Sequence, residues 1–296
     1  MYDTVLVPLD GSTFGEHAIP YAVAVAQRTG ARIELLHVHE LPVDAVGLVL
    51  DPESDEEVRE RARRYLEKTA AAVEERTGVT AGVRLAVGHA VPAIKEEASK
   101  AGAGMIVMCT HGRGGLQRAW IGSVADGLVR ESELPVLMVR PTNGKIDFGR
   151  AAALDEIVVA LDGSATSERI LPHAAALGLP ESTHYTLLRV VPPEIVVGGH
   201  IFRIDRERAR ELEEKAEEYL QERVSVLEGH AAGVAVRVVG SESPVAAILE
   251  VAEEASADLI AMTTHGYGGL KRLLLGSIMD KVLRAADVPL LVYRPS

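Results

Sequence analysis

The chain repeats itself: short segments of its first half return in its second half, in the same order. Thr4–Ser12 (TVLVPLDGS) corresponds to Glu156–Ser164 (EIVVALDGS), and Thr110–Leu116 (THGRGGL) corresponds to Thr264–Leu270 (THGYGGL). The period is about 150 residues, which is typical of a duplicated domain rather than of a solenoid repeat. Because chance similarity does not keep both order and spacing, the repeat predicts two copies of one fold.

The length of the chain agrees with two domains. Globular domains commonly contain about 100–200 residues, and this chain has 296. Between the repeats, residues 141–150 (PTNGKIDFGR) include proline, asparagine and glycine, which are typical of turns. We therefore expect one domain over residues 1–142 and a second over residues 153–296.

Strand-like and helix-like patterns alternate within each half. The expected strands of the first half are Thr4–Leu9, Ile33–Val38, Val83–Val87, Met105–Cys109 and Val136–Arg140. Four helices are expected. The first ends near Thr29, and the second begins with a capping box at Ser54–Glu57. The third spans Pro92–Ala101 and the fourth spans Ser123–Glu131. On the long second helix, one face carries Val58, Ala62, Leu66, Ala70 and Val73. The alternation predicts an α/β fold, with a doubly wound five-stranded parallel sheet in each half and helices on both faces.

Charge and cysteine content argue against several functions. The formal net charge of −12 disfavours nonspecific nucleic-acid binding and attachment to an anionic membrane. The single cysteine, Cys109, allows no disulfide within the chain, and we expect it to be a small buried side chain. The N-terminal segment lacks the pattern of a secretory signal, and the apolar stretches are too short to cross a membrane. We therefore expect a cytoplasmic protein.

The first candidate site segment follows the first strand of each half. Ligands of doubly wound folds bind beyond the carboxyl ends of the strands, where the strand order reverses. There the chain has Asp10–Ser12 in one half and Asp162–Ser164 in the other. Asp-Gly-Ser can simply start a helix, because Asp and Ser are good N-caps and glycine permits a sharp turn. It can also place a carboxylate in the crevice, where it accepts hydrogen bonds from a ligand.

The second candidate segment follows the fourth strand and is rich in glycine. Nine residues separate Gly112 from Gly122, and Ser123 follows; the second half has the same spacing in Gly266, Gly276 and Ser277. Glycine lets the backbone approach phosphate oxygens, and a helix N-terminus supplies N–H donors and a positive dipole end. The same residues can also be ordinary turns and caps. Their recurrence after a strand favours phosphate binding, although no Walker A lysine is present.

With these segments the chain resembles the universal stress protein family over nearly all of both halves. The ATP-binding members of that family carry Gly-x2-Gly-x9-Gly-Ser/Thr after the fourth strand, and the last three elements occur here twice. Cys109 and Thr263 stand at the position of the first glycine. The resemblance implies an adenine nucleotide alpha hydrolase-like fold. It also implies ATP, with Mg²⁺ on its phosphates, between the first and fourth strands of each half.

The resemblance further implies which residues hold the nucleotide. In the first half they are Pro8, Leu9, Asp10, Val38, Met108, Gly112, Arg113, Gly122, Ser123 and Val124. In the second half they are Ala160, Leu161, Asp162, Val190, Met262, His265, Gly266, Gly276, Ser277 and Ile278. Arg113 can reach a phosphate and Tyr267 replaces it, so the two sites are expected to differ. His111 and His265 either contact the ligand or satisfy carbonyls of their own loops.

The expected function is ATP binding by a nucleotide-responsive stress factor without fast catalysis. No spacing of His, Cys, Asp or Glu suggests a metal cage, and no nucleophile with a general base is apparent. Two alternatives stay open: an interaction module that needs no nucleotide, and a slow ATPase. The last strands, Val136–Arg140 and Leu290–Arg294, are expected at sheet edges. As in family dimers, these strands are expected to pair the two halves, and the whole chain is expected to form a homodimer.

Overall fold

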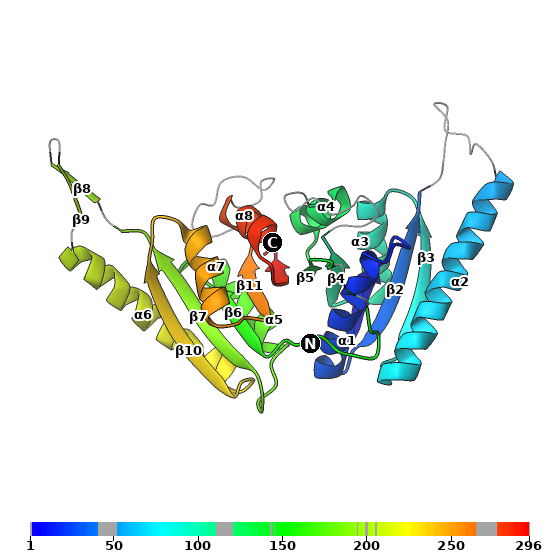
Figure 1. The fold of residues 1–296 in the computed structure, drawn as a ribbon, viewed down its shortest axis with the longest axis horizontal. Coiled ribbons are helices and arrows are strands. Elements are labelled where there is room, and N and C mark those ends of the chain that lie inside the picture. The colour runs from blue at the N-terminus through cyan, green and yellow to red at the C-terminus, as the bar shows by residue number, and fades with distance from the viewer. Residues whose placement is uncertain are drawn as a thin grey trace. The chain divides into compact units, whose positions relative to one another are not determined.

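The chain forms two compact units, Met1–Ala153 and Leu154–Ser296. The computed structural model describes residues 2–40, 52–110, 121–142, 144, 146–193, 195–198, 201–204, 206–264 and 277–295. In Figure 1 the first unit runs from blue to green and the second from green to red.

The first unit is built on a parallel sheet. Its strands are β1 (Thr4–Pro8), β2 (Arg32–His39), β3 (Ala81–Val87), β4 (Met105–Cys109) and β5 (Val136–Val139). Within the unit they lie in the order β5-β4-β1-β2-β3, and each described pairing is parallel. β4 and β5 are buried along their whole length, which explains why they read as continuous apolar runs rather than as alternating patterns.

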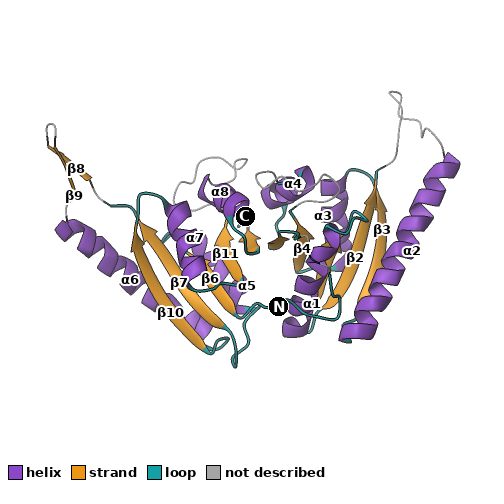
Figure 2. Ribbon diagram, viewed as in Figure 1, coloured by secondary structure: helices purple, strands orange, loops and turns teal. Residues whose placement is uncertain are grey.

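Helices cover both faces of this sheet. They are η1 (Gly15–Ala18), α1 (Ile19–Thr29), α2 (Pro52–Thr77), α3 (Ala90–Ala101) and α4 (Ser123–Glu131). α1 has Pro20 in its first turn and stops at Gly30, whose φ of 74° is left-handed. Right-handed crossovers place α1 and α2 on one face and α3 and α4 on the other, and α3 packs beside α4 (Figure 2).

The second unit repeats this plan. Its sheet has the order β10-β7-β6-β11-β12 within the unit. The strands are β6 (Glu156–Ala160), β7 (His184–Val191), β10 (Gly233–Gly240), β11 (Leu259–Thr263) and β12 (Leu290–Tyr293). The helices are η2 (Ser167–Ile170), α5 (Leu171–Ala175), α6 (Arg206–Glu228), α7 (Pro244–Glu254) and α8 (Ser277–Ala285). The α/β fold with tandem, mostly parallel sheets is therefore confirmed.

The second unit also contains an antiparallel hairpin that the sequence prediction missed. β8 (Ile195–Gly198) pairs with β9 (Ile201–Ile204) between β7 and α6. The signal was available, because two short runs rich in Ile and Val flank a Gly-Gly pair. The repeat hid this signal, since the first half suggests only a loop before its long helix.

One predicted detail of α2, its capping box, is wrong. The helix begins at Pro52, so Ser54 lies inside its first turn and is not the N-cap. Four members of the predicted helix face are buried, namely Ala62, Leu66, Ala70 and Val73, whereas Val58 near the start of the helix is 40% exposed. A helix of 26 residues is about 39 Å long and outreaches a strand of seven residues, about 23 Å, so its first turns extend past the sheet.

Among the residues that the structure describes, no helix is both long enough and apolar enough to cross a membrane.

Candidate functional site

The strand order reverses at one point in each unit. β1 lies between β2 and β4, and β6 lies between β7 and β11. The chain builds β1, β2 and β3 outward in one direction and then crosses to β4 on the opposite side. Ligands of doubly wound folds bind beyond the carboxyl ends of the strands at this position. The loops after β1, β4, β6 and β11 are therefore where a site is expected.

In the first unit, the loop after β1 holds an oriented carboxylate. Oδ1 of Asp10 accepts a hydrogen bond from the backbone N of Ser12 at 3.0 Å and another from its Oγ at 2.7 Å. Gly11 has a φ of 80°, a left-handed conformation that glycine adopts without strain. The Oγ of Ser12 also accepts from the backbone N of Gly15 at 3.2 Å, which ties the loop to η1.

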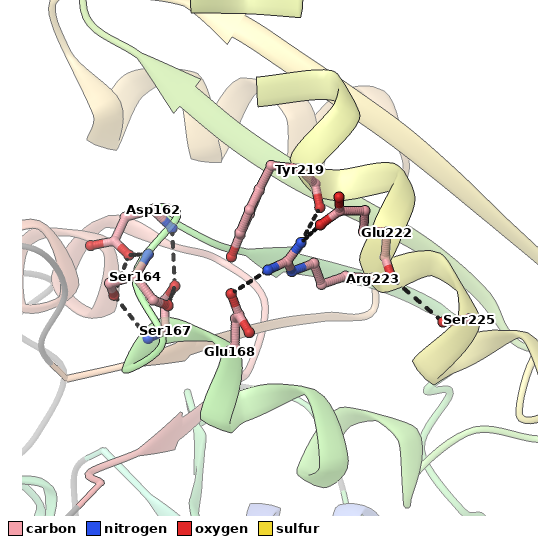
Figure 3. Close-up of polar contacts among 8 residues, drawn as sticks. All are labelled: Asp162, Ser164, Ser167, Glu168, Tyr219, Glu222, Arg223 and Ser225. Carbon is pink, nitrogen blue, oxygen red and sulfur yellow. Dashed lines mark hydrogen bonds and ion pairs between the residues drawn. The ribbon is translucent and has the colours of Figure 1, made fainter. Parts of the chain in front are cut away.

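The second unit builds the same loop around Asp162. Its Oδ1 accepts from the backbone N of Ser164 at 2.9 Å and from the Oγ of Ser164 at 2.6 Å (Figure 3). Gly163 has a φ of 88°. Here Ser167 adds two further bonds: its Oγ accepts from the backbone N of Asp162 at 3.3 Å and donates to the carbonyl of Ser164 at 2.8 Å.

Gly15 and Ser167 occupy equivalent positions and make the two loops different. A Cβ on Gly15 would lie 2.8 Å from Oδ1 of Asp10, closer than real Cβ atoms approach an oxygen. The carboxylate of Asp10 thus occupies space that a side chain at Gly15 would need. Ser167 has a side chain at this position, and its hydroxyl forms the two hydrogen bonds to the Asp162 loop described above.

Several predicted residues at the ends of β1 and β6 contribute little free hydrogen-bonding capacity. The backbone N of Leu9 donates to the carbonyl of Leu36 at 2.7 Å, and that of Leu161 donates to Leu188 at 2.9 Å. Pro8 has no N–H to donate. The buried His37 donates from Nδ1 to the carbonyl of Leu9 at 2.7 Å. Pro8, Leu9 and Leu161 therefore shape the edge of the sheet, as does Ala160 at the end of β6.

The other predicted strand residues lie at the same edge. Val38 and Val190 stand near the ends of β2 and β7 and are partly exposed. Met108 and Met262 stand near the ends of β4 and β11, with 6% and 7% of their surfaces exposed. The two methionines are nearly enclosed, and each is paired in its sheet, Met108 with Met138 and Met262 with Val292.

α4 begins at the carboxyl end of β4. Its N-cap is Gly122, which offers no side-chain cap to the first-turn N–H groups. The backbone N of Gly122 donates to the carbonyl of Thr110 at 2.8 Å, which fixes the start of α4 next to the end of β4. Ser123 is exposed at the first helical position, and Val124 is partly exposed. Ser277 and Ile278 begin α8 and are likewise exposed.

The remaining predicted site residues are Gly112, Arg113, His265, Gly266 and Gly276, and they lie outside the described residues. His111 and Tyr267 lie outside them as well.

Cys109, at the place of the first family glycine, is buried, as the sequence predicts. Its Sγ lies 3.5 Å from the carbonyl oxygen of Gly15, toward which it donates. Burial raises the pKa of the thiol well above its usual range, so the thiolate is strongly disfavoured. The side chain therefore points into the unit and adds no bulk outside it. Thr263, the counterpart in the second unit, is also buried.

Each unit has a tyrosine and a glutamate that lie together near its Asp loop, and the sequence analysis did not predict this pair. In the first unit, the hydroxyl of Tyr65 donates to Oε1 of Glu16 at 2.9 Å. Burial, together with the charge of Glu16, raises the pKa of Tyr65 above its usual range. In the second unit, Tyr219 lies beside Glu168, and burial followed by Glu168 raises the pKa of Tyr219 to about 12. The repeat contained part of the signal: Glu16 and Glu168 occupy equivalent positions, whereas Tyr219 is shifted by two residues relative to Tyr65.

The second unit adds two arginines to this pair. Cζ of Arg223 lies 4.1 Å above the ring of Tyr219, and its Nη2 lies 3.1 Å from Oε1 of Glu168 (Figure 3). Cζ of Arg189 lies 4.9 Å from the centre of the same ring. In the first unit, His37 and Thr69 stand at these two positions, and neither is an arginine.

A search of the described residues for metal-binding groups finds no cluster of three or more His, Cys, Asp or Glu side chains.

Comparison with known proteins agrees with this architecture. The profile of the universal stress protein family matches residues 1–140 and 154–294. Universal stress protein Rv2005c of Mycobacterium tuberculosis is 28% identical over 298 residues, which cover 99% of this chain and 97% of the relative. A universal stress protein of Thermus aquaticus is 35% identical over 141 residues, covering 47% of this chain and 100% of the relative. A solved universal stress protein from Archaeoglobus fulgidus has the same fold, with a TM-score of 0.70, 24% identity and 99% coverage of each chain. This chain belongs to the universal stress protein family and contains two family segments in tandem.

Proposed function

We propose that each half of the chain binds ATP, with Mg²⁺ on the phosphates, at the carboxyl edge of its sheet between the first and fourth strands. The bound nucleotide, rather than a fast reaction, is then the signal to which this stress factor responds. The proposal rests on the resemblance of the glycine spacing to that of ATP-binding family members and on the geometry of the described edge.

One observation carries the proposal. In the first unit, an oriented carboxylate at Asp10 and a helix N-terminus without a side-chain cap at Gly122 belong to the two loops that flank the reversal of strand order. The carboxylate suits the hydroxyls or amine of a nucleoside, and the helix N-terminus suits phosphate. Cys109 points toward Gly15, so replacing the first family glycine does not fill this edge.

The backbone of Gly122 makes it a sharp test position. Its φ of −59° and ψ of 149° are accessible to any residue, so Gly122→Val can fold without backbone strain. The added branches would instead stand beside the first N–H groups of α4, where a phosphate is expected. A matched control is Gly229→Val, because a Cβ there meets no atom within 4 Å.

Isothermal titration with Mg²⁺-ATP then distinguishes the sites. Wild type should bind two equivalents, Gly122→Val and Gly276→Val one each, the double variant none, and Gly229→Val two. Mass spectrometry of the supernatant from denatured, freshly purified protein should identify the carried nucleotide. If wild type binds no adenine nucleotide and releases none, the protein is instead an interaction module that works without nucleotide.

Catalysis and assembly are part of the proposal and have their own tests. Phosphate release from ATP should stay at background; release that Asp10→Ala with Asp162→Ala abolishes would indicate a slow ATPase. β5 and β12 each end the strand order of their unit, and pairing of the halves through them remains a prediction. Light scattering during size exclusion should give twice the chain mass of 31.6 kDa if the chain is a homodimer.

A further inference from the structure

The two nucleotide sites differ most clearly at one residue of the second strand. His37 in β2 and Arg189 in β7 occupy equivalent positions, each directly before the valine of the predicted site. His37 is buried and uses Nδ1 to bond the carbonyl of Leu9. Arg189 is only partly buried and carries a permanent positive charge. At the equivalent position the first unit has the imidazole of His37, which is bonded to the carbonyl of Leu9.

The guanidinium of Arg189 is clamped between the Asp162 loop and an aromatic ring. A Cβ on Gly163 would lie 2.7 Å from Cζ, 2.7 Å from Nη2 and 3.0 Å from Nη1, so all three atoms lie close over this glycine. Tyr219 contributes its ring at 4.9 Å from Cζ. The guanidinium of Arg189 is thus held between Gly163 and Tyr219, which restricts the directions that its N–H groups can take.

The clamp is itself fixed from behind. Arg223 stacks on Tyr219 at 4.1 Å and pairs with Glu168 of η2 at 3.1 Å, and Figure 3 shows Tyr219 and Arg223 projecting from α6 toward Glu168. Glu168 is therefore engaged by Arg223. Among the described residues, no carboxylate pairs with Arg189, which lies against the ring of Tyr219. A pre-oriented guanidinium fork without a protein anion is suited to bind an anionic oxygen pair.

Topology indicates where on a nucleotide that anion would be. In doubly wound dinucleotide-binding folds, the side chain that reads the ribose is acidic when it bonds the 2′-hydroxyl, whereas an arginine accommodates a 2′-phosphate. β7 is the second strand of its unit and neighbours β6 on the side away from the reversal of strand order. Arg189 is thus on the nucleoside side, whereas the start of α8 is on the phosphate side.

We infer that Arg189 makes the site of the second unit select adenine nucleotides that carry a phosphate on the ribose, in addition to the 5′-phosphate. The inference rests on the proposed function, because it assigns the ligand class of one of the two proposed sites. The first unit, with His37 bonded inward, has no such preference. The two copies of one fold therefore both accept ATP but differ in the adenine nucleotide that they bind most tightly.

Competition binding with paired ligands tests the assignment. ADP and adenosine 2′,5′-bisphosphate each have two phosphoryl groups, in different places, and adenosine 3′,5′-bisphosphate distinguishes the ribose positions. Each is titrated into full-length wild type, Arg189→His (the residue of the first unit), Arg189→Lys and Arg210→His, an exposed arginine of α6. Thermal unfolding of each variant reports its folding.

The expected result is a class of site that prefers a ribose-phosphorylated ligand over ADP in wild type and in Arg210→His. Arg189→His should weaken that ligand about tenfold or more, as the loss of a bidentate charged contact does, with ADP changed less than about threefold. Arg189→Lys keeps the charge but loses the planar guanidinium, so its affinity for this ligand should lie between those of wild type and Arg189→His. It provides the measurement if Arg189→His does not fold.

The contrary results are distinct. Binding of ATP and ADP without any preference for either bisphosphate, or an equal loss in Arg210→His, would overturn the inference and leave the proposed function standing. If wild type binds no adenine nucleotide at all, the proposed function itself fails, and the assignment of Arg189 fails with it.

Discussion

A buried carboxylate distinguishes the sheet of the first unit from that of the second. Glu34 of β2 has a side chain that is 9% exposed and lies over Gly82, where a Cβ would be 2.7 Å from its Oε2. Arg84 of β3 approaches Oε2 of Glu34 at 3.2 Å and Oε2 of Glu97 at 3.0 Å. The strand register places Thr186 of the second unit where Glu34 stands in the first.

Removing Arg84 should lower the free energy of unfolding much more than removing Glu34. In Arg84→Ala, the one cation that stays near the carboxylate of Glu34 among the described residues is Arg32, which is half exposed and lies at 3.6 Å. Breaking a buried pair costs about 3–5 kcal/mol; since Arg84 is 26% exposed and Arg32 remains, we expect about 2–3 kcal/mol. In Glu34→Thr the buried charge disappears and Arg84 keeps Glu97, so the expected cost is about 1 kcal/mol or less.

Urea unfolding measures the difference. The single tryptophan, Trp120, lies in the first half of the sequence and serves as the fluorescence probe, with circular dichroism as the second. With a typical m-value of about 2 kcal/mol per molar urea, Arg84→Ala should lower the midpoint by about 1 M. The double variant should recover most of that loss, because it leaves no orphaned carboxylate. A double variant no more stable than Arg84→Ala, or a Glu34→Thr that costs as much, would refute the reasoning.

Three further predictions follow from the same structure. Burial, with the nearby Arg169, lowers the pKa of His173 to about 4, so the native state disfavours its proton. Stability should therefore be complete above the unfolded pKa of about 6.5 and fall as the pH drops toward 4, and His173→Gln should flatten this decline in the urea midpoint. Gly15→Ala should displace the carboxylate of Asp10 and remove one equivalent of ATP in titration calorimetry, with no loss of the second. Cys109 should resist a thiol reagent at pH 8 until urea unfolds the first unit; rapid reaction in the native state would contradict its burial.

Local sequence patterns were enough to predict most of the helices and strands, and also the family. The sequence predicts β4 at Met105–Cys109 and α4 at Ser123–Glu131, and the structure has the same bounds. Such runs can be predicted because strand burial and helix periodicity depend on residues that are near one another in the chain. The internal repeat then doubles every local signal, which is why the tandem α/β architecture could be predicted. The hairpin β8–β9 was missed because it interrupts the repeat.

The sequence also determined that Asp10, Asp162, Gly122 and Ser277 follow strands, and therefore that they belong to one edge of each sheet. The sequence also predicts one difference between the sites, Arg113 against Tyr267, but only the tertiary structure decided how the described parts of the two edges differ. The contact of Arg189 with Gly163 and Tyr219 joins a strand, a loop and a helix that are distant in the chain. Its inward-facing counterpart, His37, depends in the same way on the carbonyl of Leu9, the residue that follows the neighbouring strand β1. The direction and partner of a side chain are set by the parallel pairing of strands and the packing of a helix over them, and neither leaves a periodic trace in the sequence.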